Sequence, residues 1–341
     1  MIQTDVVIVG AGPCGLFQVF ELGLLGLKAE VIDSIRQPGG QCSELYPDKP
    51  IYDIPAIPVC TGQELTDNLL KQIVPFHCGM HLGDEVTIVR RQDDNTFFVE
   101  TAGGKRFSAK AVVIAGGVGS FQPRPLRVPH AKEFENISLH YRVRDPRQFT
   151  GKKLVILGGG DSALDWVLAL ADKAGQVTLV HRRDEYRAAP LSVARMQALA
   201  ASGSIDVVEN GKATGITGSA GRMTAITIQL KDGAAMEIAA DHALVFFGLA
   251  PKLGPIADWG LDINRKTINV DTGKFETSEA GIYAVGDINQ YPGKKKLILC
   301  GFHEAALAAF AIKQRMEPDK KVHVQYTTTS PIMHQRLGVT D

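Results

Sequence analysis

Two glycine-rich turns in the sequence have the spacing of dinucleotide-binding sites. The first is GAGPCG at residues 10–15, directly after the apolar run TDVVIV. In such a turn the first glycine permits a tight bend, the second lets the backbone approach a pyrophosphate, and the third lets a helix pack closely on the strand. These positions are Gly10, Gly12 and Gly15. The following helix would present free N–H groups to phosphate oxygens. Asp33, at the end of the next predicted strand, is placed to accept hydrogen bonds from ribose hydroxyls.

The second turn lies in GGGDSA at residues 158–163 and has the GxGxxA form. Its candidate binding residues are Gly158, Gly160, Asp161, Ser162 and Ala163. The next predicted strand ends in basic residues instead of an acid, namely His181, Arg182 and Arg183, with Arg187 close behind. Arginine binds a 2′-phosphate through paired donors, whereas a carboxylate would repel it. We therefore predict NADP(H) at this turn; the other interpretation is that these arginines form a solvated basic face.

Two different nucleotide sites in one chain favour electron transfer between them. NADPH gives up a hydride, and a flavin accepts it and releases electrons in pairs or singly. The first turn is therefore predicted to bind FAD. The reaction needs little acid–base chemistry, because it depends on holding nicotinamide C4 roughly 3–3.5 Å from flavin N5.

The elements that must position these turns alternate between strands and helices. A strand at 4–9, a helix at 13–26 and a strand at 28–33 make one βαβ unit, and the pattern restarts with a strand at 152–157. A helix over 61–76 is predicted to begin with a capping box of Thr61 and Glu64. We predict an α/β fold with two Rossmann-like dinucleotide-binding domains. The NADP(H) domain, residues 120–250, is inserted into an FAD domain of residues 1–119 and 251–341, with glycine-containing hinges near 117–120 and 248–252.

Composition excludes several other classes of protein. The 37 basic and 37 acidic residues give a net charge of zero, which argues against nucleic-acid binding. No apolar run is long enough to span a membrane, and the N-terminus opens directly on a strand, so we expect a cytoplasmic protein. Five scattered cysteines fit a reducing compartment, and the nine histidines show no metal-ligand spacing.

Three motifs make the chain resemble the two-dinucleotide-binding flavoproteins with the thioredoxin reductase fold. They are GAGPCG, GGGDSALDW with HRRDEYRA, and GIYAVGD at 281–287. Thioredoxin reductases carry a Cys-x-x-Cys before the second turn, but the matching stretch 139–153 contains no cysteine. GGQCSELYPDKPIYDIP (39–55) and YTTTSP (326–331) instead resemble the ferredoxin/flavodoxin–NADP+ reductases of thioredoxin-reductase type.

That resemblance implies specific residues around FAD. The implied contacts are Asp33, Gln41, Tyr46, Val86, Phe121, Asp287 and Thr328. The Tyr46 ring would stack on one flavin face, although it is also a candidate for loop packing and Tyr52 is a weaker rival. Tyr326, or Thr327 if the register shifts by one, would cover the other face. The stretch from Thr327 to Ser330, with Thr328 as the candidate, would offer a hydroxyl near N5. Tyr46, Tyr326 and Thr328 are therefore the candidate catalytic residues, and the tail is expected to reach a partner subunit's flavin in a homodimer.

Ferredoxin or flavodoxin is the partner that this resemblance implies. Lys294, Lys295 and Lys296 are candidates for steering an acidic partner, although a solvated lysine run is the plainer interpretation. One alternative function is a thiol–disulfide reductase using Cys14 and Cys42. Another is a non-catalytic redox sensor that binds FAD and NADPH without turnover. A flavin monooxygenase is disfavoured, because no substrate-domain insertion is evident.

Overall fold

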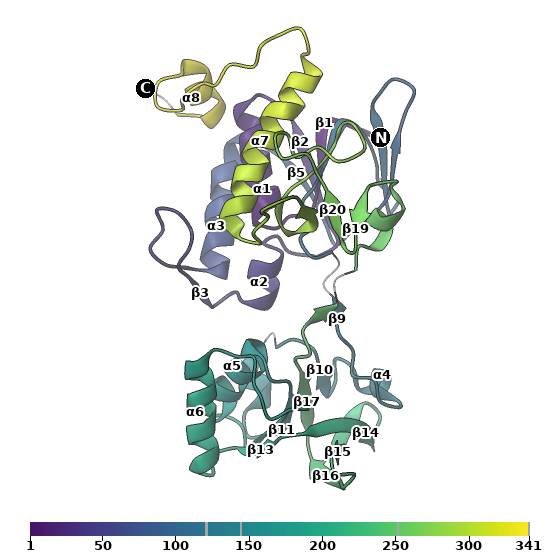
Figure 1. The fold of residues 1–341 in the computed structure, drawn as a ribbon, viewed down its shortest axis with the longest axis vertical. Helices are drawn as coiled ribbons and strands as arrows, with labels where there is room; N and C mark the ends of the chain where they lie inside the picture. Colours follow the sequence, from purple (N-terminus) through teal and green to yellow (C-terminus); the bar gives the residue numbers. More distant parts are fainter. Residues whose placement is uncertain (120–121, 144, 251, 340–341) are drawn as a thin grey trace. The chain divides into compact units, whose positions relative to one another are not determined.

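The computed structural model describes residues 1–119, 122–143, 145–250 and 252–339. The chain divides into two compact units, each formed around its own core (Figure 1). Unit 1 consists of Met1–Phe121 together with Pro251–Asp341, and unit 2 is the intervening segment Gln122–Ala250. Phe121, one of the implied flavin contacts, lies outside the described residues.

A seven-stranded sheet forms the centre of unit 1, in the order β5-β2-β1-β8-β7-β6 with β21 also paired to β8. These strands are β1 (Ile2–Val9), β2 (Ala29–Asp33), β5 (Gly79–Leu82), β6 (Val86–Arg91), β7 (Phe97–Thr101), β8 (Arg106–Ile114) and β21 (Ile282–Ala284). The strand β1 runs parallel to both β2 and β8. The antiparallel β7 pairs with residues 106–109 of β8, and the parallel β21 pairs with 112–114, so a strand from beyond unit 2 completes this sheet.

Both faces of this sheet are covered, as the continuous apolar runs of its central strands require. Val6 and Ile8 of β1 pack toward a cluster that includes Leu16, while Val7 faces a second cluster that includes Trp259. Helices α1 (Pro13–Leu24), α3 (Gly62–Ile73) and α7 (Ile298–Met316) lie side by side on the first face (Figure 1). The smaller elements of unit 1 are α2 (Gln41–Leu45), β3 (Pro50–Ile51), β4 (Cys60–Thr61), η1 (Val74–Phe76), η3 (Gly254–Asp258), β19 (Ile263–Asn264), β20 (Thr267–Asn269), η4 (Gly286–Ile288), β22 (Asn289–Gln290) and α8 (Pro331–Leu337).

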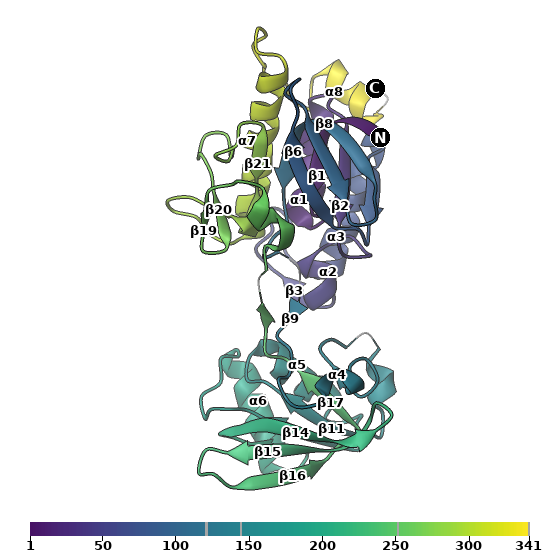
Figure 2. The ribbon, with the colours of Figure 1, turned by 90° about the vertical axis from the view of Figure 1, so that its right-hand side faces the viewer.

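Unit 2 contains a five-stranded parallel sheet in the order β10-β17-β11-β12-β13. Figure 2 shows an antiparallel sheet, β14-β15-β16, beside it in the same unit. The elements are β9 (Gln122–Pro123), α4 (Ala131–Phe134), β10 (Leu139–His140), η2 (Pro146–Phe149), β11 (Lys153–Leu157), α5 (Asp161–Leu170), β12 (Gln176–Val180), α6 (Pro190–Ala201), β13 (Asp206–Val208), β14 (Gly211–Ser219), β15 (Arg222–Leu230), β16 (Ala235–Ala239), β17 (His242–Val245) and β18 (Leu249–Ala250). Two apolar clusters cover the faces of the parallel sheet.

Local signals predicted several element boundaries correctly. The capping box of α3 is confirmed: Thr61 Oγ1 accepts a hydrogen bond from the Glu64 N–H at 3.1 Å, and a Glu64 carboxylate oxygen accepts one from the Thr61 N–H at 2.7 Å. The helix α8 was not predicted, because it lies in a tail without clear periodicity. Its start is nevertheless marked by Ser330, whose hydroxyl accepts from the Met333 N–H, and by Pro331 in the first turn.

Candidate functional site

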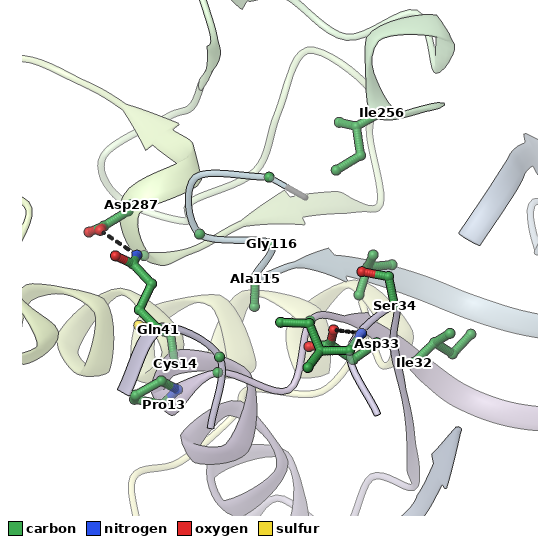
Figure 3. Close-up of a pocket in the computed structure, with 18 of the residues that line it drawn as sticks. Pro13, Cys14, Ile32, Asp33, Ser34, Gln41, Ala115, Gly116, Ile256 and Asp287 are labelled. Atoms are coloured by element: carbon green, nitrogen blue, oxygen red, sulfur yellow. Dashed lines mark hydrogen bonds between the residues drawn. The ribbon is translucent and has the colours of Figure 1, made fainter. Parts of the chain in front are cut away.

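A pocket opens in unit 1 where the first glycine turn meets the ends of β1, β2 and β8 (Figure 3). The helix α2 with its two capping residues, the segment around Asp287 and the beginning of α7 complete its wall. The sequence candidates that line it are Gly10, Gly12, Asp33, Gln41, Tyr46, Val86 and Asp287. A crevice outside the carboxyl ends of parallel strands is the usual ligand site in such sheets.

The three glycines of the first turn have different surroundings. Gly10 has a φ of +115°, and a Cβ there would lie 2.5 Å from the Ala115 carbonyl oxygen. A Cβ at Gly15 would lie 1.9 Å from the Gly10 oxygen, so this glycine permits close contact between α1 and the strand end. A Cβ at Gly12 would meet nothing nearer than the Gly40 Cα at 3.9 Å, and it would project into the pocket region. The space beside Gly12 is thus open to a ligand.

Asp33 lies at the end of β2 with its carboxylate held by the backbone. One oxygen accepts a hydrogen bond from the Ala11 N–H at 2.6 Å, and the other accepts one from the Ile35 N–H at 2.8 Å. Burial raises the pKa of this carboxyl, while the two backbone N–H groups oppose the rise. Each oxygen keeps acceptor capacity for a hydroxyl donor, because a carboxylate oxygen has two lone pairs.

Gln41 and Asp287 meet across the pocket although 246 residues separate them. Gln41 Nε2 donates to Asp287 Oδ2 at 3.3 Å, as Figure 3 shows. Gln41 begins α2, and Asp287 lies in η4 directly after β21. This hydrogen bond joins the two loops at one edge of the pocket.

The two tyrosines weighed for the flavin face differ in position. Tyr46 lines the pocket, and its hydroxyl accepts a hydrogen bond from Cys42 Sγ at 3.5 Å. Tyr52 is 71% exposed and is absent from the described pocket wall. Tyr46 is therefore the residue of the two that is available to a ring bound in this pocket.

Tyr326 and Thr328 do not line the pocket of their own chain as the structure describes it. Both are exposed, Tyr326 to 71%. The tail is anchored by α8 at the far end of α1, where Arg336 donates a hydrogen bond to the Leu24 carbonyl. The pocket lies at the N-terminal end of this 12-residue helix, which contributes Pro13 and Cys14 to its wall, and the helix is about 18 Å long. Within one chain the tail is thus separated from the pocket.

The second glycine turn in unit 2 repeats the arrangement of the first. A Cβ at Gly158 would lie 2.8 Å from both the Phe246 oxygen and the Ala163 Cβ, which makes this the close-packed position. A Cβ at Gly160 would meet no atom within 4 Å, which makes this the open position. The helix α5 begins at Asp161, and Ser162 is exposed in its first turn.

The basic segment folds back over this turn. The strand β12 ends at Val180, so the stretch from His181 to Arg183 lies in a turn and not in the predicted strand. The Arg187 N–H donates to the Gly159 oxygen at 2.7 Å, and the His181 ring packs against Gly159. The exposed side chains of this segment include Arg182, Arg183 and Arg187. The Asp161 carboxylate accepts a hydrogen bond from the Ala189 N–H at 2.8 Å, which links the beginning of α5 to the beginning of α6.

Lys294 is the clearest correction to the sequence analysis, which placed it in a surface lysine run. Its side chain is only 2% exposed and its Nζ lies 2.5 Å from a carboxylate oxygen of Glu304. Lys295 and Lys296 are exposed, and Lys296 lines the pocket. The signal that sequence reasoning missed is Glu304 itself, an acid beside the apolar run AALAAF of α7.

The cysteines at the pocket are thiols in a setting that disfavours the thiolate. All five cysteines are free. Burial raises the pKa of Cys14 to about 12, with Glu304 adding to the rise, and burial also raises the pKa of Cys42. In the described part of the chain, no set of three or more His, Cys, Asp or Glu residues is grouped to hold a metal ion. Among the described helices, none is both long and apolar enough to cross a membrane.

Comparison with solved structures establishes the fold of the chain. The chain is similar to thioredoxin reductase from T. acidophilum, with a TM-score of 0.75 at 23% identity, covering 93% of this chain and 100% of that one. It is equally similar to a bacillithiol disulfide reductase from Staphylococcus aureus, with a TM-score of 0.75 at 19% identity, covering 94% and 100%. The predicted thioredoxin-reductase-like fold with Rossmann-like sheets is thereby confirmed.

Sequence comparison defines the family. The profile of the pyridine nucleotide-disulphide oxidoreductases matches residues 4–314, and the chain belongs to that family. It is 60% identical to a ferredoxin–NADP reductase of Methylibium petroleiphilum, covering 99% of this chain and 93% of the relative. It is also 60% identical to ferredoxin–NADP reductase 2 of Cupriavidus metallidurans, covering 99% and 92%.

Proposed function

We propose that this chain is an FAD-dependent oxidoreductase of the ferredoxin–NADP+ reductase type, which transfers electrons between NADPH and ferredoxin or flavodoxin. The observation that carries the proposal is the pair of open glycine positions, Gly12 and Gly160, one in each unit. Relatives with 60% identity over nearly the whole chain are named ferredoxin–NADP reductases. When bound, FAD supplies the ability to accept a hydride and to release single electrons.

Each part of FAD has candidate binding residues in the pocket of unit 1. Gly12 and the start of α1 bind the pyrophosphate, because the open glycine leaves room and the helix N-terminus offers N–H donors. Asp33 accepts from ribose hydroxyls. Gln41 and Asp287 bind further along the pocket, and Tyr46 packs against the flat ring. Val86 contributes its apolar side chain to the wall.

In unit 2 the second turn binds NADP(H). The backbone at Gly158 and Gly160 and the first turn of α5 bind the pyrophosphate. The exposed guanidinium groups of Arg182, Arg183 and Arg187 bind the 2′-phosphate. Arg182→Ala is expected to raise the KM for NADPH at least about tenfold while leaving the KM for NADH nearly unchanged. A wild-type preference for NADH would contradict the assignment.

We propose further that the protein is a cytoplasmic homodimer in which Tyr326 and Thr328 act at the partner subunit's flavin. The exposed apolar side chains of the tail, including Val324 and Ile332, support this, as does the distance of α8 from the pocket. Tyr326 would cover the ring face and move aside for nicotinamide. A mixed dimer tests the idea: Gly12→Ala and Tyr326→Ser subunits have their defects in different sites. If the tail acts within its own chain, each site of the mixed dimer still contains one of the two defects, so no site becomes fully competent.

A steady-state comparison decides between this function and the alternatives. NADPH oxidation is measured with ferredoxin, flavodoxin and thioredoxin side by side, with NADH as the control donor. We expect turnover with ferredoxin or flavodoxin and little with thioredoxin. Turnover with thioredoxin alone would favour a thiol–disulfide reductase. Rapid mixing with NADPH that leaves the flavin absorbance unchanged would favour a non-catalytic sensor.

A further inference from the structure

A fully buried carboxylate lies behind the pocket of unit 1. Glu304, in α7, has an exposed fraction of 0%. One carboxylate oxygen accepts from the Gly286 N–H at 2.7 Å and from Asn289 Nδ2 at 2.8 Å. The other accepts from the Tyr291 hydroxyl at 2.9 Å and from Lys294 Nζ at 2.5 Å. Four donors thus surround this carboxylate, and all four come from the segment 286–294.

Lys294 closes a ring of interactions around one residue of that segment. Besides Glu304, its Nζ donates to the Gly286 carbonyl at 2.9 Å. The Gly286 N–H donates to Glu304, and the Gly286 C=O accepts from Lys294. The two members of one ion pair therefore bind the N–H and the C=O of the same residue. The next residue is Asp287, which lines the pocket and accepts from Gln41.

Steric packing also holds Gly286 in place. Gly286 has a φ of +79°, and a Cβ there would lie 3.0 Å from Cys14 Sγ. A Cβ at Gly301 in α7 would lie 2.2 Å from that sulfur. The Cys14 side chain therefore lies between Gly301 of α7 and Gly286, and it restricts movement of Gly286 toward α1.

Stability alone does not account for a buried ion pair at this place. Removing two charges from water costs several kcal/mol per ion, and well-packed apolar residues of similar volume are often as stabilising or more so. What an apolar pair would not provide is an acceptor for the buried Gly286 N–H and a donor that joins the Asn289 N–H at the Gly286 C=O. Glu304 thus orients the Val285–Gly286 peptide and Lys294 orients the Gly286–Asp287 peptide, the two peptides that precede Asp287.

We propose that Lys294 and Glu304 are positioning residues that hold Asp287 at the edge of the cofactor pocket, and that they thereby set the affinity for the flavin nucleotide. The inference rests on the proposed function, since it takes FAD as the ligand of this pocket. It concerns only residues of unit 1, so binding of NADP(H) to unit 2 is the internal reference.

The test is a binding measurement with Glu304→Gln. FAD is removed from the purified protein, and the dissociation constant for added FAD is measured from the quenching of its fluorescence. Loss of the charged hydrogen bonds is expected to weaken FAD at least about tenfold and to alter the visible circular dichroism of the bound flavin. NADP+ affinity is expected to stay within about twofold of wild type.

A matched control lies at the other end of the same helix. Lys313 Nζ pairs with a Glu317 oxygen at 2.7 Å, and both side chains are partly exposed. Glu317→Gln removes an ion pair from α7 without touching the segment 286–294, so its FAD affinity should equal that of the wild type.

A double-mutant cycle separates positioning from a general loss of stability. If Glu304 acts through Asp287, Asp287→Asn and Glu304→Gln lower the affinity for FAD by less together than the product of their separate effects. Where Glu304→Gln does not fold, Tyr291→Phe removes one donor while leaving both charges paired, and a several-fold weaker affinity for FAD is then expected.

Folded variants that lower the melting temperature but bind FAD as tightly as wild type would overturn the inference. Full additivity in the cycle would do the same. A wild-type protein that binds no FAD would instead refute the proposed function, so the two failures are distinguishable.

Discussion

Replacing Gly12 by alanine should separate cofactor binding from folding. Gly12 has φ −72° and ψ 179°, which alanine adopts without strain, and its Cβ would meet only the Gly40 Cα at 3.9 Å. Folding stability should therefore change by no more than about 0.5 to 1 kcal/mol, in either direction. The added methyl would lie in the space through which, in the proposed function, the FAD pyrophosphate approaches the backbone. Loss of one charge-assisted hydrogen bond, about 1.5–3 kcal/mol, corresponds to an FAD affinity about 10- to 150-fold weaker.

The measurement pairs FAD titration with thermal unfolding, and two other glycines provide the controls. Gly160→Ala, at the equivalent open position of unit 2, should weaken NADP(H) and spare FAD. Gly10→Ala should destabilise unit 1 by about 2 kcal/mol or more, because its φ is +115° and its Cβ would lie 2.5 Å from the Ala115 oxygen. The reasoning fails if folded Gly12→Ala protein binds FAD as tightly as the wild type.

Three further predictions concern local features of the structure. Thr61→Ala removes the N-cap of α3 and should cost about 1 kcal/mol in urea unfolding, with no change in NADP(H) affinity. His140 Nε2 lies 3.1 Å from His242 Nδ1. Burial, and to a lesser extent the neighbouring His242, lowers the pKa of His140 from 6.5 to about 4. The contribution of neutral His140 to folding stability is therefore complete above pH 6.5 and is lost as the pH falls toward 4. After a discount for solvent screening, His140→Gln should reduce the loss of stability in acid by about 1–2 kcal/mol. The measurement is the melting temperature at about pH 7.5 and at about pH 5. Cys14→Ser and Cys42→Ser should retain turnover with ferredoxin to within a few-fold, and loss of turnover in folded, flavin-loaded variants would restore the disulfide mechanism.

Some features of this protein are determined by short stretches of sequence. The turn at Gly10 requires a backbone conformation that glycine adopts easily, and the capping box at Thr61 depends on residues three apart. The two βαβ units follow from apolar runs that alternate with helical periodicity. These patterns can be recognised in the sequence because each depends on the local conformation of a few neighbouring residues.

Other features were decided only when distant segments came together. The lysine run at 294–296 is charged throughout, yet the first of its members is buried because Glu304 of α7 and the Gly286 carbonyl supply acceptors there. The contact between Gln41 and Asp287 has no local signature, since α2 and η4 meet only after unit 1 has closed around its sheet. The place of the tail depends likewise on Arg336 reaching the end of α1. Burial and ion pairing are properties of the tertiary environment, so the same lysine that would be solvated in an isolated loop becomes the buried partner of Glu304.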